Sequence, residues 1–113
     1  MVAQDAAPDR GDIVWISLNP QAGHEQAGRR PVLILSPEAY NRKVGLALCC
    51  PITGQRKGYP FEVDLPAEGA VSGVILADQV KCLDWRARQA DIHGSAPIDV
   101  VNEALGKLAS LLQ

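Results

Sequence analysis

The sequence has few of the residues from which disulfide-bonded, metal-binding or membrane-spanning proteins are built. Its 113 residues include three cysteines and two histidines, and no CxxC pair occurs. An odd number of cysteines, two of them adjacent, forms neither a disulfide framework nor a zinc site. No apolar run approaches the roughly 18 residues that a membrane helix needs. The polar, acidic first residues lack the basic start and apolar run of a secretory signal, which predicts a cytoplasmic protein.

Aromatic residues and standard catalytic motifs are also scarce. Aromatic residues make up 4% of the chain, and it contains no phosphate-binding glycine loop, GxGxxG or HExxH sequence. His24 and His93 lie far apart in the sequence, so we expect neither a metal nor a cofactor. Apolar residues at 47% and charged residues at 21% are near the globular average. The length then predicts a single domain over residues 1–113.

The small net charge of −2 hides an uneven distribution of charged residues. Residues 26–61 carry six basic residues and one acidic residue, whereas both flanking segments are net acidic. The basic residues form three doublets, Arg29-Arg30, Arg42-Lys43 and Arg56-Lys57. They are either one local surface for a polyanion or three solvated loop tips, and composition leaves both interpretations open.

Hydrophobic patterns predict a chain made mostly of strands. Apolar or alternating stretches occupy residues 12–18, 31–36, 45–52, 61–65, 72–77, 80–83 and 85–92, with turn residues between them. Residues 37–43 could hold a helical turn, and Cys49 and Cys50 are expected to be small core residues on opposite strand faces. After Pro97, an apolar stripe predicts an amphipathic helix over Ile98, Val101, Leu105, Leu108 and Leu112. The pattern is typical of a small barrel or sandwich of six or seven strands with a C-terminal helix.

A polar loop precedes the second predicted strand and concentrates charged side chains. His24, Glu25, Arg29 and Arg30 all lie between Gly23 and the buried stretch that follows. Guanidinium groups clamp phosphates with a planar fork of donors, so this loop could form an anion site. A flexible loop with a surface ion pair is the other interpretation. A threonine after the third strand, at position 53, adds a hydroxyl but carries little information alone.

Nine segments, taken in their order and spacing, resemble a known family. They are Gly11-Asp-Ile-Val-Trp15, Asn19-Pro20, Gly23-His-Glu-Gln-Ala-Gly-Arg-Arg-Pro31, Leu35-Ser-Pro37, Tyr40-Asn41, Pro51-Ile-Thr53, Lys57-Gly-Tyr-Pro-Phe-Glu62, Ala77-Asp-Gln-Val-Lys81 and Trp85-Arg-Ala-Arg88. From about residue 9 to the end, the chain resembles the MazF/PemK, or Kid-like, endoribonucleases of type II toxin–antitoxin systems.

The resemblance implies a fold, an activity and partners. The fold is an SH3-like barrel of the CcdB/Kid/MazF type with a C-terminal helix, working as a homodimer. The activity is sequence-specific, metal-independent cleavage of single-stranded RNA, mostly mRNA, which leaves a 2′,3′-cyclic phosphate and a 5′-hydroxyl and thereby inhibits translation and growth. The partner is a MazE-like antitoxin with an acidic, disordered tail, and the complex of the two binds DNA. A disordered inhibitor that folds on binding can cover a large surface.

The resemblance also assigns roles to individual residues. It implies that the catalytic residues are Arg30, Thr53 and Glu25. It implies that the substrate-binding residues are His24, Arg29, Asn41, Lys57, Asp78 and Gln79. Leu76 stands where the PemK/Kid branch has an arginine. This departure weakens a mechanism that pairs Asp78 with an arginine and favours Arg30 with Thr53.

Two other functions fit the same barrel. A CcdB-like gyrase poison shares the architecture but cleaves nothing, and a non-catalytic SH3-like module would bind nucleic acid or peptide and leave it intact. Only the ribonuclease needs both Arg30 and Thr53. With so few aromatic residues, we expect RNA bases to be read more by hydrogen bonds than by stacking, with Tyr59 or Phe61 as the available rings.

Overall fold

A computed structural model describes residues 6–19, 23–69 and 71–113; the acidic start of the chain and Pro20 of the quoted motifs lie outside them. Its elements, in chain order, are β1 (Asp12–Ser17), β2 (Arg29–Ile34), α1 (Glu38–Val44), β3 (Leu46–Thr53), β4 (Glu62–Asp64), β5 (Val74–Leu76), the 3₁₀ turn η2 (Ala77–Gln79), β6 (Lys81–Asp84), β7 (Asp91–Ser95) and α2 (Ile98–Leu111). Six of the seven predicted strands and both predicted helical segments are present near their expected positions.

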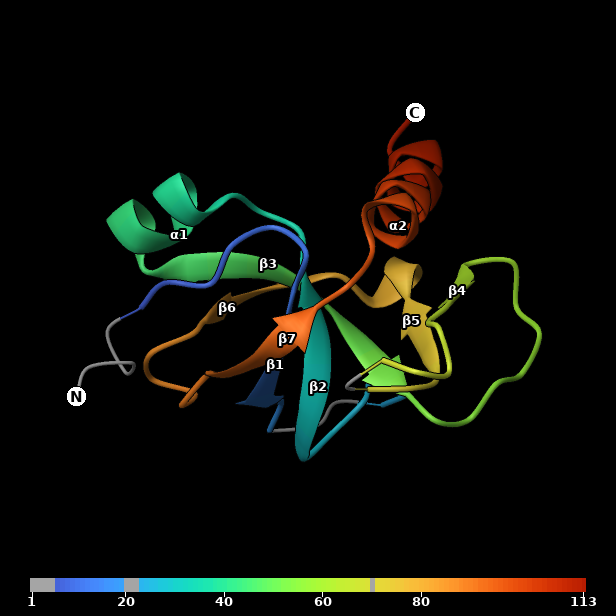
Figure 1. The fold of residues 1–113 in the computed structure, drawn as a ribbon, viewed down its shortest axis with the longest axis horizontal. Coiled ribbons are helices and arrows are strands. Elements are labelled where there is room, and N and C mark those ends of the chain that lie inside the picture. Colours follow the sequence, from blue (N-terminus) through green and yellow to red (C-terminus); the bar gives the residue numbers. More distant parts are fainter. Residues whose placement is uncertain (1–5, 20–22, 70) are drawn as a thin grey trace.

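The long strand β3 organises the sheet, and all strand pairs that the structure describes are antiparallel. One edge of β3 pairs with β2, which continues through β1 to β7. Its other edge is divided, because β6 pairs with its first half and β5 with its last two residues. The sheet therefore curls into a barrel-like shape, with α2 above one side and α1 near the far end (Figure 1).

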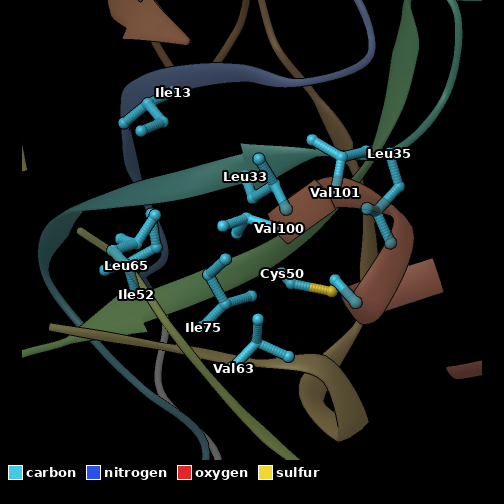
Figure 2. Packing of buried hydrophobic residues seen from close by; sticks show 11 residues of the cluster. Ile13, Leu33, Leu35, Cys50, Ile52, Val63, Leu65, Ile75, Val100 and Val101 are labelled. Atoms are coloured by element: carbon cyan, nitrogen blue, oxygen red, sulfur yellow. The ribbon is translucent and has the colours of Figure 1, made fainter. Parts of the chain in front are cut away.

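Both faces of the sheet are buried, which explains why the second strand is almost wholly apolar. One core cluster lies beneath α2 and includes Leu33, Cys50 and Val101 (Figure 2). The second cluster, on the other face, includes Cys49 and Trp85. The placement of the two adjacent cysteines on opposite faces is confirmed. Burial raises the pKa of each thiol to about 12, so both stay neutral at physiological pH.

The strand predicted at residues 85–92 is wrong. Residues 85–89 form a turn, and the strand begins only at Asp91. The Asp84 carboxylate accepts a hydrogen bond from the Ala87 amide, and Gln89 has a φ of 57°. A side chain that caps its own backbone and a residue in left-handed conformation both favour a turn over a strand.

The C-terminal helix is present, but its apolar stripe is only partly buried. Val100, Val101 and Ala104 are buried, whereas Ile98 and Leu112 are 71% and 77% exposed. The helix packs against η2 and β4. Pro97 occupies the N-cap, and no side chain caps the helix. Among the described residues, no helix has the length and apolar character needed to cross a membrane.

Candidate functional site

A cavity of about 360 Å³ opens where the β1–β2 loop, the end of β3, the β3–β4 loop and η2 meet. Its wall is more polar than either core cluster, because loop residues supply half of it and most of the lining side chains are polar. The lining residues are His24, Gln26, Thr53, Gln55, Lys57, Tyr59, Glu62, Leu76, Asp78 and Gln79. Amide, hydroxyl, ammonium, imidazole and carboxylate groups thus face one space, which suits a polar ligand with several hydrogen-bonding edges.

Five of the residues assigned to the site from sequence line this cavity: His24, Thr53, Lys57, Asp78 and Gln79. They come from four separate segments of the chain. The fold therefore brings together side chains that lie up to 55 positions apart in the printed sequence. Such convergence of polar groups at one opening is characteristic of a binding or catalytic site.

Thr53 is the last residue of β3 and is almost wholly buried, with 6% of the residue exposed. Its hydroxyl oxygen accepts a hydrogen bond from the Gln55 amide at 3.2 Å. The hydroxyl proton can still be donated into the cavity. The neighbouring strand approaches closely at this point, because a Cβ on Gly73 would lie 2.3 Å from the Thr53 carbonyl oxygen. Gly73, with a φ of +122°, therefore lets β5 close on the end of β3.

Arg30 is not a lining residue, but it lies near the start of β2, on the strand that pairs with β3. β2 and β3 are antiparallel, and their pairing ends at Val32 and Pro51. Arg30 lies two residues before Val32 and pairs with Ile16 of β1, whereas Thr53 lies two residues after Pro51 and pairs with Val74 of β5. The Arg30 Nε donates to the Ala27 carbonyl at 2.8 Å. Within the described part of the chain, its terminal Nη atoms have no partner, so they are available to an anion.

Glu25 points to a neighbouring strand and not into the cavity. Its Oε1 accepts a hydrogen bond from the Lys81 Nζ at 2.6 Å, in an ion pair whose side chains are 46% and 21% exposed. Next to it, the Gln26 amide donates to the Gln79 Oε1 at 3.2 Å. Two contacts thus hold the β1–β2 loop against η2 and β6, and the loop carries His24 to the cavity.

The comparison with known protein families decides the class of this site. A family described as the PemK-like, MazF-like toxin of type II toxin-antitoxin systems matches residues 9–112. The chain belongs to this family. Both the predicted family and the predicted fold class are thereby confirmed, and the barrel's polar cavity is that of a MazF-like toxin.

Individual MazF-like proteins are similar over most of their length. The endoribonuclease toxin MazF of Escherichia coli K12 is 53% identical over 88 residues, which are 78% of each chain. The endoribonuclease PemK of Escherichia coli is 37% identical over 116 residues, covering 99% of this chain and 87% of PemK. The crystal structure of MazF from Deinococcus radiodurans superposes with a TM-score of 0.91 at 58% identity, covering 94% and 96% of the two chains. That MazF has also been solved as a MazE–MazF complex, with a TM-score of 0.85.

Two residues assigned to substrate binding from the MazF-like resemblance are engaged elsewhere. Asn41 is fully buried, and its amide bonds to Ser36 and to the Pro8 carbonyl. Arg29 is exposed and donates from Nη2 to the Gln89 carbonyl at 2.9 Å. We therefore correct the interpretation of Asn41, which holds the fold together and has no surface for RNA. Arg29 lies outside the lining and stays a prediction.

Sequence reasoning gave no role to four residues of this MazF-like site. Gln26, Gln55 and Glu62 line the cavity, and Lys81 pairs with Glu25. All except Gln55 lie within the segments that carry the family resemblance, but residue type and spacing do not say which loop side chains face inward. Leu76 does line the cavity, so an apolar side chain occupies the place where the PemK/Kid branch is expected to have an arginine.

Proposed function

We propose that this toxin cleaves single-stranded RNA in the cytoplasm, mostly mRNA, and so stops translation and growth. Family membership and relatives whose names describe them as endoribonucleases support this proposal. We further propose that it works as a homodimer and is inhibited by a MazE-like antitoxin with an acidic, disordered tail. A relative has been solved bound to MazE, and Lys57 in the cavity lining is a cation with which an acidic segment can pair.

The observation that carries the proposal is the polar cavity at the end of β3, with Thr53 in its lining and Arg30 on the neighbouring strand β2. Within the described residues, the terminal nitrogens of the Arg30 guanidinium have no partner. In our proposal a phosphodiester bound at the cavity meets both this guanidinium and the Thr53 hydroxyl. Neither a gyrase poison nor a binding module needs both groups, so their presence in one chain favours the ribonuclease over both alternatives.

RNA supplies its own nucleophile, and the proposed reaction uses it. The 2′-hydroxyl attacks the adjacent phosphorus, the bond from phosphorus to the 5′ oxygen breaks, and a 2′,3′-cyclic phosphate and a 5′-hydroxyl remain. DNA lacks the 2′-hydroxyl and is therefore not cleaved by this reaction. The protein has to hold the nucleotide for in-line attack, stabilise the added negative charge and move a proton.

Arg30 and Thr53 suit the stabilisation of charge. A guanidinium has a permanent charge and a planar fork of donors that can meet two phosphate oxygens, and the Thr53 hydroxyl adds one donor. The loss of one such donor raises the barrier by about 3 kcal/mol. Arg30 is not the general base, because a guanidinium keeps its proton at neutral pH. It donates a hydrogen bond to the leaving 5′ oxygen, and solvent completes the 5′-hydroxyl.

His24 is better placed than Glu25 to accept the proton of the 2′-hydroxyl. His24 lines the cavity, whereas the Glu25 carboxylate is paired with Lys81 outside the lining. Histidine also exchanges protons near neutral pH. In this proposal Glu25 holds the loop that carries His24 in place and does not accept the proton of the 2′-hydroxyl.

The decisive experiment incubates the pure protein with single-stranded RNA in EDTA and maps the new ends. We expect cuts at a short recurring sequence, with cyclic-phosphate ends and no cleavage of DNA of the same sequence. Arg30→Ala should slow cleavage by about a hundredfold or more, as expected for a lost transition-state donor. Arg42→Ala is the matched control, because Arg42 pairs with Glu38 on α1. This variant should cleave RNA at the wild-type rate.

Three results would count against parts of the proposal. Intact RNA with the wild-type protein would reject the ribonuclease and leave the two non-cleaving alternatives. The double variant of Arg30→Ala and Thr53→Ala gives the second test. If its cleavage rate fell by the product of the two single fold-reductions, Arg30 and Thr53 would not act on one transition state. If His24→Ala kept the pH–rate profile of the wild type, with the same fall at acidic pH, His24 would not be the base.

A further inference from the structure

The β3–β4 loop, residues 54–61, provides a large part of the cavity wall but contains no helix or strand. Gln55, Lys57 and Tyr59 alternate along it, and all three line the cavity. The Lys57 Nζ lies 6.0 Å from the centre of the Tyr59 ring. The loop thus offers an amide, a cation and an aromatic ring to the same space, which are the groups that recognise an unpaired nucleotide.

The shape of this loop depends on one carboxylate. Glu62, the first residue of β4, accepts the Lys57 amide on Oε2 and the Gly58 amide on Oε1, both at 3.0 Å. Two successive amides of an otherwise irregular loop are therefore bound by one carboxylate. Hydrogen bonds to a charged acceptor are stronger than those between neutral groups. Gly58 has a φ of +80°, a left-handed conformation that glycine adopts without steric cost and that turns the chain after the bound amide.

The backbone of Glu62 is fixed independently of its side chain. Its amide donates to the Tyr59 carbonyl at 3.1 Å, and its carbonyl accepts the Lys107 Nζ at 2.8 Å. β4 also pairs with β5, where Glu62 lies opposite Leu76. The carboxylate therefore projects from a rigid position on the sheet, and the loop is built around it.

We infer that Glu62 is the residue that positions the nucleotide-reading loop, and through the loop it sets which RNA sequence is cut. This inference rests on the proposed ribonuclease function. Both oxygens of the carboxylate are bound by the loop amides, and a negative charge repels phosphate, so Glu62 acts through Lys57 and Tyr59. Its effect belongs to substrate binding and selection and not to the bond-breaking step.

The substitution Glu62→Gln tests this inference with little change of size. One of the two loop amides loses its acceptor, because the new NH₂ group is itself a donor. We expect KM to rise about tenfold with kcat nearly unchanged, as when binding energy is lost equally from ground and transition states. End mapping should show weaker preference for the favoured cut sequence over secondary ones. Glu68→Gln, an exposed glutamate outside the cavity lining, is the matched control and should behave as the wild type.

A double variant separates positioning from other effects. If Glu62 acts by holding Lys57, the substitution Glu62→Gln should raise KM less in the Lys57→Ala background than in the wild-type background. Amide hydrogen exchange supplies a readout that does not depend on activity. The Lys57 and Gly58 amides should exchange faster in Glu62→Gln, while amides of β1 and β2 keep their protection.

Each outcome bears on a different claim. A wild-type protein that leaves RNA intact overturns the proposed function. A wild type that cleaves, with Glu62→Gln unchanged in KM and cut pattern, overturns the role of Glu62 alone. A drop in kcat with the cut pattern unchanged also overturns it, since that result would assign Glu62 to the chemical step or to general stability.

Discussion

Asn41 is a buried amide whose hydrogen bonds join three parts of the chain. Its Oδ1 accepts from the Ser36 Oγ at 2.6 Å, and its Nδ2 donates to the carbonyls of Pro8 and Ser36 at 2.8 and 3.0 Å. Its own carbonyl accepts the indole N–H of Trp85 at 2.9 Å. Every polar atom of the side chain is thus satisfied away from water, which is the condition under which a buried amide is stabilising.

We therefore predict that Asn41→Ala destabilises the protein by about 3 kcal/mol, because the substitution leaves buried carbonyl and hydroxyl groups without partners. RNA cleavage per folded molecule should stay unchanged. Urea denaturation measures the first effect, and cleavage assays well below the unfolding midpoint measure the second. Asn102→Ala, on the exposed face of α2, is the control and should change stability very little. An Asn41→Ala variant that is stable but inactive would show that Asn41 does act in RNA binding or cleavage.

At the scale of elements, the β1–β2 loop is attached to η2 and β6 by two side-chain contacts. The Lys81–Glu25 ion pair and the bond from the Gln26 amide to Gln79 both cross to the same neighbouring segment. An exposed ion pair contributes little to global stability, at most about 1 kcal/mol. It can still matter locally, since the loop that it attaches carries His24, which lines the cavity.

We predict that Lys81→Met lowers kcat/KM about fivefold, which corresponds to the loss of about 1 kcal/mol from loop placement. The methionine keeps the apolar stem of lysine and removes the charge. Lys81→Arg should restore most of the activity, because arginine keeps the ion pair. Steady-state cleavage kinetics of the two variants provide the measurement. Equal activity of Lys81→Met and wild type would mean that the loop needs no such attachment.

The elements themselves could largely be predicted, and the errors have physical causes. Alternating or wholly apolar stretches predict strands because strand faces repeat every two residues. Residues 85–92 look like a strand, but the Asp84 cap and the left-handed Gln89 turn the chain there, and neither is visible as a pattern. In α2, Ile98 continues the apolar stripe, yet it is exposed, because the stripe alone does not show how much of the helix the rest of the fold covers.

The site could be predicted in part, because the segments that resemble the family contain most of its lining. The resemblance assigns residues to a site by position, without knowledge of which side chains are buried. It therefore included Asn41, whose amide is enclosed by the fold. It gave no role to Glu62, whose importance depends on two backbone amides of a loop. The pairing of β2 with β3, the strands that carry Arg30 and Thr53, is also a property of the folded sheet, which no single strand encodes.

At the scale of the whole molecule, the three basic doublets do not form one surface. α1, which carries Arg42 and Lys43, lies at the opposite end of the molecule from β4 and β5 (Figure 1). Arg42 pairs with Glu38, and Arg56 pairs with Asp64. Among the described residues, Lys57 in the cavity lining and Arg30 on the neighbouring strand β2 have no acidic partner. The net charge of −2 leaves little attraction for RNA beyond these two.

We accordingly predict a weak salt dependence of RNA binding. Two phosphate contacts to a single strand give a slope of about −1.4 for log K against log salt concentration, since each contact contributes about −0.7. Lys57→Ala should reduce the slope by about 0.7, and Arg42→Ala should leave it unchanged. Fluorescence anisotropy with an RNA carrying a 2′-deoxy sugar at the cut site measures binding without cleavage. A slope as steep as about −4 would require phosphate contacts from all three doublets, and so would contradict the placement of α1 away from the cavity.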